Sequence, residues 1–224
     1  MQPLSLAIST GHVTACRYDA ERPRSTFILA HGAGAGQAHP FMVRIATSLA
    51  SQGIDVFTFN FPYADRGKSA PDQAPVLEAC YLDVIRDVQA RAEGRPLFIG
   101  GKSMGGRIAT QIAARETTTG ISGIVVLGYP LHPPGKPDVL RVKHLDAIRA
   151  PILIVQGTRD AFGSPTELEP YFAPHGPRAK ILAIDRGDHS LAVPKTKTGR
   201  SQADVYREID DTIVAWMDSV AQRR

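Results

Sequence analysis

A single serine stands among glycines in the stretch Ile99-Gly100-Gly101-Lys102-Ser103-Met104-Gly105-Gly106. The apolar run 96–99 before it predicts a strand, and the spacing of Ile108 and Ile112 after it predicts a helix. A Gly-x-Ser-x-Gly motif between a strand and a helix is typical of a nucleophile elbow, a tight turn that holds the serine in a strained conformation. Ser103 is therefore the candidate nucleophile.

Parts of the chain resemble phosphate-binding motifs, but their spacing does not fit. Gly101-Lys102-Ser103 has the ending of a P-loop, yet the first glycine of that motif would fall on Pro96. A second Gly-Lys-Ser, at 67–69, has Pro62 in the same place. The segment 32–36 lacks the last glycine of a dinucleotide fingerprint. The sequence predicts neither kind of site, and we expect no cofactor and no metal.

A serine nucleophile needs a base to take its proton, and the base needs a carboxylate that orients it. After a nucleophile elbow, the acid and then the histidine follow along the chain. Asp160 follows the apolar run 151–155, and His189 lies in the loop after the run 180–184. All three residues then come at the carboxyl ends of predicted strands, where open parallel sheets place their sites. We predict a triad of Ser103, Asp160 and His189.

The acid and the base also have structural interpretations. Asp160 could cap the turn after its strand, and a histidine in a loop is often only solvated. Asp185 and Asp188 are rival acids for His189. However, adjacent side chains on an extended loop diverge, which disfavours Asp188. Asp160 is therefore the preferred acid.

Backbone N–H groups usually bind the oxyanion of an acyl-transfer reaction. Met104, directly after the nucleophile, is expected to supply one of them. The second is expected from the loop that begins with His31 and continues as Gly-Ala-Gly-Ala-Gly. We expect the N–H of Ala33 to take this role, with Gly34 behind it, and His31 to brace the loop by hydrogen bonds.

Four motifs carry a family resemblance: His-Gly-Ala-Gly at 31–34, Phe-Pro-Tyr at 61–63, Gly-Gly-Lys-Ser-Met-Gly-Gly-Arg at 100–107 and Tyr-Pro-Leu-His-Pro-Pro-Gly-Lys-Pro at 129–137. From about 26 to 189, the chain resembles the small α/β-hydrolases near the dienelactone-hydrolase-like and testis-expressed-hydrolase-like branch. The resemblance implies the same triad of Ser103, Asp160 and His189. Dienelactone hydrolases use a cysteine nucleophile, so their substrate is not expected here.

Predicted strands and helices alternate along the chain, which indicates the α/β class. We expect a doubly wound, mostly parallel sheet with helices on both faces, and an antiparallel edge formed by 4–9 and 12–18. A lid could come only from 129–150, a segment with four prolines that is too short for a helical cap. We therefore expect an α/β-hydrolase fold with minimal or no lid, a shallow open site, and a single domain over residues 1–224.

The composition narrows the choice of partners. No apolar stretch approaches the roughly 20 residues of a membrane span, and the net charge of +4 comes from dispersed basic residues without interleaved aromatics. Two distant cysteines and a start without a basic region indicate a protein of a reducing compartment. We expect a cytoplasmic monomer or homodimer that binds neither membranes nor nucleic acid.

Residues expected at the rim of the site could contact substrate: Tyr63, Lys102, Tyr129, His132 and Phe162. Basic residues could favour an anionic group there: Arg66, Lys68 and Lys195.

The expected activity is hydrolysis of small soluble carboxylic esters, through a Ser-His-Asp triad and an acyl-enzyme. The partner is then a small-molecule acyl substrate. A thioesterase or peptidase with the same triad remains open, because the choice of leaving group depends on the pocket. A non-catalytic protein-interaction module is the other alternative, since the resemblance extends to such members. The complete set of candidate residues favours the enzyme.

Overall fold

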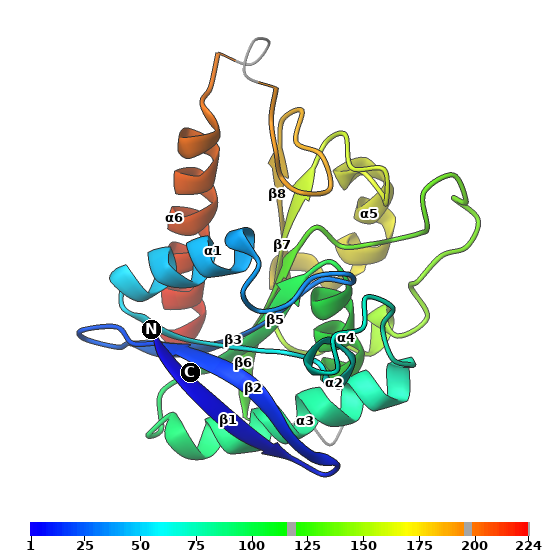
Figure 1. The fold of residues 1–224 in the computed structure, drawn as a ribbon. Coiled ribbons are helices and arrows are strands. Elements are labelled where there is room, and N and C mark those ends of the chain that lie inside the picture. The colour runs from blue at the N-terminus through cyan, green and yellow to red at the C-terminus, as the bar shows by residue number, and fades with distance from the viewer. Residues whose placement is uncertain (116–119, 195–198, 224) are drawn as a thin grey trace.

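The computed structural model describes residues 1–115, 120–194 and 199–223. Within these ranges, eight strands form one sheet in the order β1-β2-β4-β3-β5-β6-β7-β8 (Figure 1). The strands are β1 (Gln2–Ile8), β2 (Gly11–Tyr18), β3 (Ser25–Ala30), β4 (Ile54–Phe59), β5 (Leu97–Lys102), β6 (Ile121–Leu127), β7 (Ile152–Gly157) and β8 (Ala179–Ile184). The pairs β1–β2 and β2–β4 are antiparallel, and the sheet is parallel from β4 to β8. The predicted fold class and antiparallel edge are confirmed.

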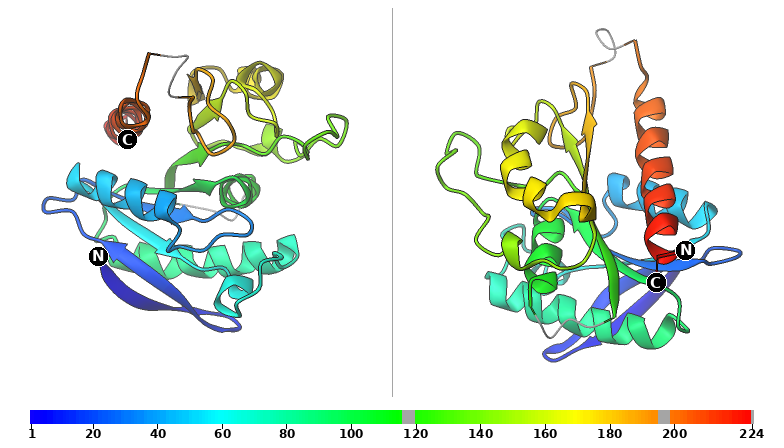
Figure 2. Two further views of the ribbon diagram at one scale, coloured as in Figure 1. Left: turned by 45° about the horizontal axis from the view of Figure 1, so that its top comes forward. Right: turned by 180° about the vertical axis from the view of Figure 1, so that it is seen from behind.

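Helices cover both faces of the sheet (Figure 2). On one face lie α1 (Pro40–Ser51) and α6 (Gln202–Ala221), and on the other α3 (Ala74–Arg91), α4 (Met104–Ala113) and α5 (Pro165–Phe172). The shorter turns are α2 (Pro62–Asp65), η1 (Leu145–Ala147) and η2 (Ala173–Arg178). Along β3, Phe27 packs on the α1–α6 face and Ile28 on the α3–α4 face. This alternation follows from the two-residue period of a strand.

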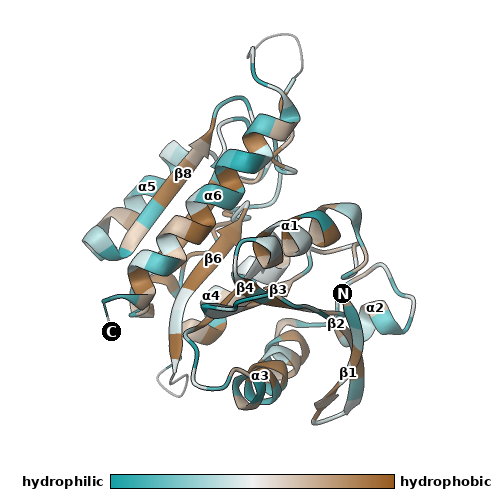
Figure 3. Cartoon of the chain, turned by 90° about the vertical axis from the view of Figure 1, so that its left-hand side faces the viewer, coloured by the Kyte–Doolittle hydropathy of each residue, from teal (hydrophilic) through white to brown (hydrophobic). Residues whose placement is uncertain are grey.

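The central strands are apolar on both sides because helices bury both of their faces. Every residue of β3, β4, β6 and β7 is buried, whereas the edge strand β8 is largely half-exposed. Figure 3 shows β6 as mainly hydrophobic, while α6 carries both hydrophobic and hydrophilic residues. The buried residues of α6 include Ile209, Ile213 and Met217, at the spacing of one helical face.

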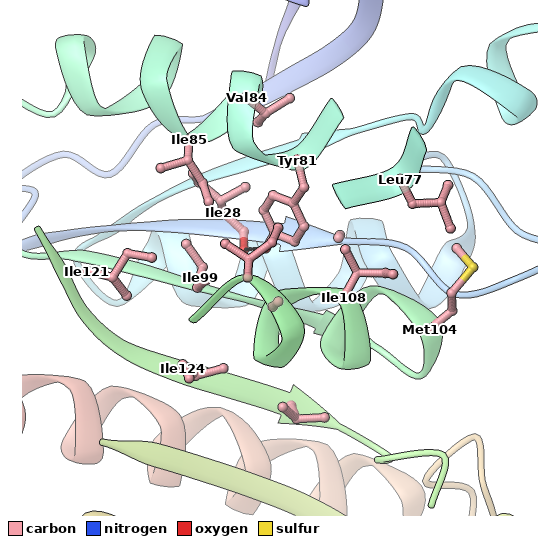
Figure 4. Close-up of a cluster of buried hydrophobic side chains, with 14 of the residues drawn as sticks. Ile28, Leu77, Tyr81, Val84, Ile85, Ile99, Met104, Ile108, Ile121 and Ile124 are labelled. Carbon is pink, nitrogen blue, oxygen red and sulfur yellow. Dashed lines mark hydrogen bonds between the residues drawn. The ribbon is translucent and has the colours of Figure 1, made fainter. Parts of the chain in front are cut away.

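A buried tyrosine connects α3 to the strand that leads to the candidate nucleophile. The ring of Tyr81 points from α3 into a cluster that includes Ile28, Ile99 and Ile108 (Figure 4). Its hydroxyl donates a hydrogen bond to the carbonyl oxygen of Gly100 at 2.6 Å and accepts one from the Gly100 N–H at 2.9 Å. Burial raises the pKa of this hydroxyl, so it stays protonated. The middle of β5 is therefore fixed from the helix side as well as within the sheet.

The segment between β6 and β7 contains no α-helix and only the short turn η1. No helical lid covers the carboxyl edge of the sheet in the described ranges, as the sequence predicts. None of the helices in those ranges has the length and apolar character that a bilayer crossing requires. The carboxyl ends of β3, β5, β7 and β8 all lead into loops along this uncovered edge.

Candidate active site

Ser103 occupies the turn between β5 and α4, with φ of +50° and ψ of −113°. Few non-glycine residues adopt positive φ, and such strain is maintained only where the surroundings enforce it. Here the Ser103 N–H donates to the Leu127 carbonyl at 3.0 Å, which ties the turn to β6. The backbone of Ser103 thus has the strained conformation of a nucleophile elbow.

Glycines on both sides of Ser103 let α4 lie very close to β3. A Cβ on Gly105 would lie 2.5 Å from the carbonyl oxygen of Ala30, and one on Gly101 would overlap the same oxygen. That carbonyl belongs to the backbone and cannot move aside without distorting the sheet. The turn therefore excludes side chains at both positions.

The structure brings Ser103, Asp160 and His189 together from three separate loops. The Nε2 atom of His189 lies 2.8 Å from the Oγ of Ser103, and its Nδ1 atom lies 2.7 Å from the Oδ2 of Asp160. The Asp160 side chain is fully buried, while 22 % of the His189 side chain is exposed. The carboxylate fixes the proton of the imidazole on Nδ1, which leaves Nε2 free to accept the proton of the hydroxyl.

Gln156, a residue that sequence reasoning missed, supports the acid. Its Nε2 donates to the Oδ2 of Asp160 at 2.9 Å, and its Oε1 accepts from the Tyr129 N–H at 2.7 Å. The N–H of Phe162 donates to the other carboxylate oxygen at 2.8 Å. Gln156 is completely buried in β7. A polar residue inside an otherwise apolar strand was the available signal, because a buried amide needs hydrogen-bond partners.

Two further residues hold the histidine in place. The ring of Phe162 lies over the imidazole of His189, with 4.1 Å between the ring centroids. The ammonium of Lys102 donates to the backbone carbonyl of His189 at 2.5 Å. Burial lowers the pKa of Lys102 to about 8, although Asp160 and Asp188 act in the opposite direction. The residue before the nucleophile thus anchors the loop that carries the imidazole.

The rival acids do not contact the imidazole. Asp188 instead accepts hydrogen bonds from the N–H groups of Ser190 and Ala192, at 2.8 and 3.0 Å, and so closes the turn of its own loop. Asp185 is exposed at the start of this loop. Asp160 is the carboxylate that meets His189.

The two backbone groups expected to bind an oxyanion lie beside Ser103. Ala33 and Met104 both line the cleft that contains Ser103. Within the described parts of the chain, neither of their N–H groups donates to an acceptor. Gly34 does not line this cleft. This arrangement favours Ala33 over Gly34.

His31 lies beneath the loop that presents Ala33. It is completely buried, and burial lowers its pKa, which favours the neutral imidazole. Its Nδ1 donates to the Gly32 carbonyl at 2.8 Å, and its Nε2 accepts from the Phe61 N–H at 3.0 Å. These bonds brace the loop on the side away from the cleft.

The cleft around Ser103 has a volume of about 840 Å³. Lys102 and Phe162 line it, but Tyr63, Tyr129 and His132 do not. All three are buried, the hydroxyl of Tyr129 donates to the Arg141 carbonyl at 2.6 Å, and His132 lies 3.3 Å from Glu167. The expectation that these three residues contact substrate is corrected, because the loops cover their side chains.

The basic residues named from the sequence are not the cations of this cleft. Arg66 is paired with Asp72 at 2.6 Å, Lys68 is exposed away from the cleft, and Lys195 lies outside the described residues. Arg107 and Arg141 line the cleft instead. No group of three or more histidine, cysteine, aspartate or glutamate side chains in the described ranges is arranged to hold a metal ion.

A family model described as "Alpha/beta hydrolase domain" matches residues 23–218. The chain is similar to XC6422 from Xanthomonas campestris, a serine hydrolase without a lid, at a TM-score of 0.75 and 17% identity over 96% of this chain and 94% of that one. It is also similar to a dienelactone hydrolase from Anabaena variabilis, at a TM-score of 0.76 and 16% identity over 98% and 99% of the chains. A third similar structure is Est1E from Butyrivibrio proteoclasticus with bound ferulic acid, at a TM-score of 0.77 and 14% identity over 99% of this chain and 100% of that one. At identities this low, the three comparisons show that the chain has the same fold as these proteins.

Proposed function

The chain belongs to the α/β hydrolase family, and from that premise we propose that it is a serine hydrolase that cleaves small carboxylic esters. The observation that supports this most directly is the hydrogen-bonded series from the Ser103 hydroxyl through His189 to the buried carboxylate of Asp160. A strained serine backbone supports it further, because an interaction module has no use for strain at this position.

In the proposed reaction, Nε2 of His189 removes the hydroxyl proton of Ser103 as Oγ attacks the ester carbonyl. The negative charge that develops on the carbonyl oxygen is stabilised by the N–H groups of Met104 and Ala33. The imidazolium then gives its proton to the leaving alcohol, which leaves an acyl group on Ser103. Water, deprotonated by His189, attacks this acyl-enzyme and releases the acid.

Asp160 acts on this reaction through His189. Its carboxylate holds the Nδ1 proton and stabilises the positive charge that the imidazole acquires. Hydrogen bonds from Gln156 and from the Phe162 N–H keep this carboxylate in position.

The proposal places the enzyme in the cytoplasm as a single domain. Cys16 and Cys80 are free thiols, which a reducing compartment maintains. The same residues can also cleave thioesters and amides, and the contacts of the pocket determine which leaving group is accepted.

Labelling with a fluorophosphonate probe tests this function, because the probe reacts with an activated serine. We expect labelling of the wild-type protein and its loss in Ser103→Ala. Ser190→Ala is a matched control, since Ser190 lines the same cleft, and this variant should label normally. Equal labelling of Ser103→Ala, or no labelling of the wild type, would contradict the proposal.

A further inference from the structure

Arginines without a carboxylate partner line the cleft beside Ser103. Arg107 lies on α4, Arg141 lies in the segment 129–150, and both are half-buried. Across the described residues, neither forms an ion pair. The other arginine of the cleft, Arg44, differs because it pairs with Asp210 at 2.7 Å. Two guanidinium groups thus keep N–H donors that no carboxylate of the described chain satisfies.

Both arginines are held firmly by their backbones. Arg107 lies one helical turn after the nucleophile, and its N–H donates to the Ser103 carbonyl at 3.0 Å. The backbone of Arg141 forms two hydrogen bonds within its loop. Its N–H donates to the Leu131 carbonyl at 2.8 Å, and its carbonyl accepts from the Tyr129 hydroxyl at 2.6 Å. A fixed main chain limits the positions that the two guanidinium groups can reach, which reduces the conformational freedom lost when a ligand binds.

The guanidinium groups lie close enough to influence each other. Burial and the neighbouring charge of Arg107 together lower the pKa of Arg141, and burial also lowers that of Arg107. The burial of His144 and the charge of Arg107 lower the pKa of this histidine to about 4, so it is neutral near pH 7. Two like charges in a partly desolvated place are unfavourable unless an anion joins them.

These two side chains form few hydrogen bonds, so most of their N–H groups are available to an anion. Arg107 donates to the amide oxygen of Gln111 at 3.3 Å, and Arg141 donates to the Pro130 carbonyl at 3.2 Å. Each guanidinium has five N–H donors. Among the described residues, Asp72 is the single carboxylate that lines the cleft, and Arg66 already neutralises it. Nothing else in the described cleft balances the two charges.

We propose that Arg107 and Arg141 form an anion-binding subsite, and that the substrate carries a carboxylate or phosphate group which these two side chains bind. The paired oxygens of either group match the planar fork of a guanidinium. The substrate class rests on the proposed function, since it is the ester bound at Ser103 that would extend into this subsite. Arg107 and Arg141 then select substrates that are anionic at the end away from the ester bond.

The kinetic test compares two umbelliferyl esters: the neutral ester of valeric acid and the monoester of glutaric acid, whose acyl chain ends in a carboxylate. The measured quantity is the ratio of kcat/KM for the anionic ester to that for the neutral ester. Loss of one charge-assisted hydrogen bond is worth about tenfold or more. We expect Arg107→Gln and Arg141→Gln each to lower the ratio by about this factor, and the double variant to lower it further.

The ratio isolates charge recognition, because damage to the fold or to Ser103 affects both esters. Arg86→Gln is the matched control: it removes the same charge from a side chain that is 73% exposed and outside the cleft. It should leave the ratio unchanged. An equal fall in the ratio for Arg86→Gln would attribute the effect to net charge, and no fall in the arginine variants of the cleft would overturn the proposal.

Binding measurements test the subsite without catalysis. Titration calorimetry on Ser103→Ala, with glutarate and separately with inorganic phosphate, should give saturable binding of at least one anion. The anion that binds more tightly identifies the chemistry of the group. Binding should be lost when Arg107→Gln and Arg141→Gln are added. If wild-type protein fails to react with the fluorophosphonate while Ser103→Ala still binds anions through these arginines, the proposed function fails and the subsite stands. If neither anion binds, the subsite is refuted.

Discussion

The nucleophile turn and the segment 129–150 both border the cleft, but they are held in place by different means. At the turn, Gly101 and Gly105 lie against the backbone of β3 so closely that no side chain fits. The segment is held by individual hydrogen bonds, such as those from Tyr129 to Arg141 and from Tyr129 to Gln156. The turn is fixed by steric exclusion, and the segment by polar contacts.

This difference separates the proposed chemistry from the proposed selectivity. Bond-making atoms must be placed within a fraction of an ångström, and backbone packing provides such precision. Loops that carry substrate contacts can change one hydrogen bond at a time without loss of the fold. Substitutions at the turn should therefore abolish activity towards every ester, and substitutions in the segment should change which ester is preferred.

The largest effect is expected at the turn itself. Ser103→Ala and His189→Ala should each lower kcat/KM for a neutral ester by a thousandfold or more, and the double variant should be scarcely worse than either. Residues that act as one unit behave in this way. Steady-state kinetics of the three variants measure it. Losses that multiply in the double variant would show that the two side chains act independently.

Gly105→Ala tests whether steric exclusion fixes the nucleophile turn. The added Cβ meets the Ala30 carbonyl at 2.5 Å, and because this backbone oxygen cannot move aside, we expect the free energy of unfolding to fall by about 3 kcal/mol, the upper end of the usual cost of overpacking. Gly135→Ala in the segment is the control, since its φ of +72° is strained for alanine but its surroundings are open. We expect about 1 kcal/mol there. Urea denaturation measures both, and equal losses would refute the steric explanation of the turn.

Lys102→Met should lower kcat about tenfold, because the ammonium positions the loop that carries His189. Since burial lowers the pKa of Lys102 to about 8, the ammonium is present below that pH and is lost as the pH rises through it. Wild-type kcat should therefore fall as the pH rises from 8 to 9, and this decline should be absent in Lys102→Met. A pH–kcat profile of each protein checks the prediction. The same decline in both proteins would exclude Lys102 as its origin.

The smallest effect is expected in the segment. Tyr129→Phe removes the hydrogen bond to the Arg141 carbonyl, which should lower the free energy of unfolding by about 1 kcal/mol. The anionic glutarate ester should lose a few-fold in kcat/KM, because Arg141 is less well held, and the neutral ester should change by less than about twofold. A larger loss with the neutral ester would show that the segment also supports the proposed chemistry.

Local patterns were sufficient to predict the sheet, the elbow and the convergence of Ser103, Asp160 and His189. The elbow motif and the ends of the strands can each be recognised from a few neighbouring residues. Because the carboxyl ends of parallel strands lie at one edge of the sheet, Asp160 and His189 are then expected at the same edge. The catalytic role of these residues stays a prediction.

Contacts between distant segments could not be predicted in this way. The burial of Tyr63 and Tyr129 depends on loops that pack over them, and no local signal reports this. Arg107 follows Ser103 by one turn, but it lines the same cleft as Arg141 only because the segment 129–150 borders that cleft. Lys102 lines the cleft as expected, but sequence patterns did not reveal that its ammonium donates to a backbone carbonyl in a loop 87 residues later.

The absence of a helical lid between β6 and β7 in the described chain has a consequence for turnover. Bulk solvent reaches the carboxyl edge of the sheet without an opening motion, so no slow gating step need precede product release. In the proposed reaction, water at its full concentration can then compete with any added alcohol for the acyl group on Ser103. We therefore expect the proposed enzyme to favour hydrolysis over the transfer of acyl groups between alcohols.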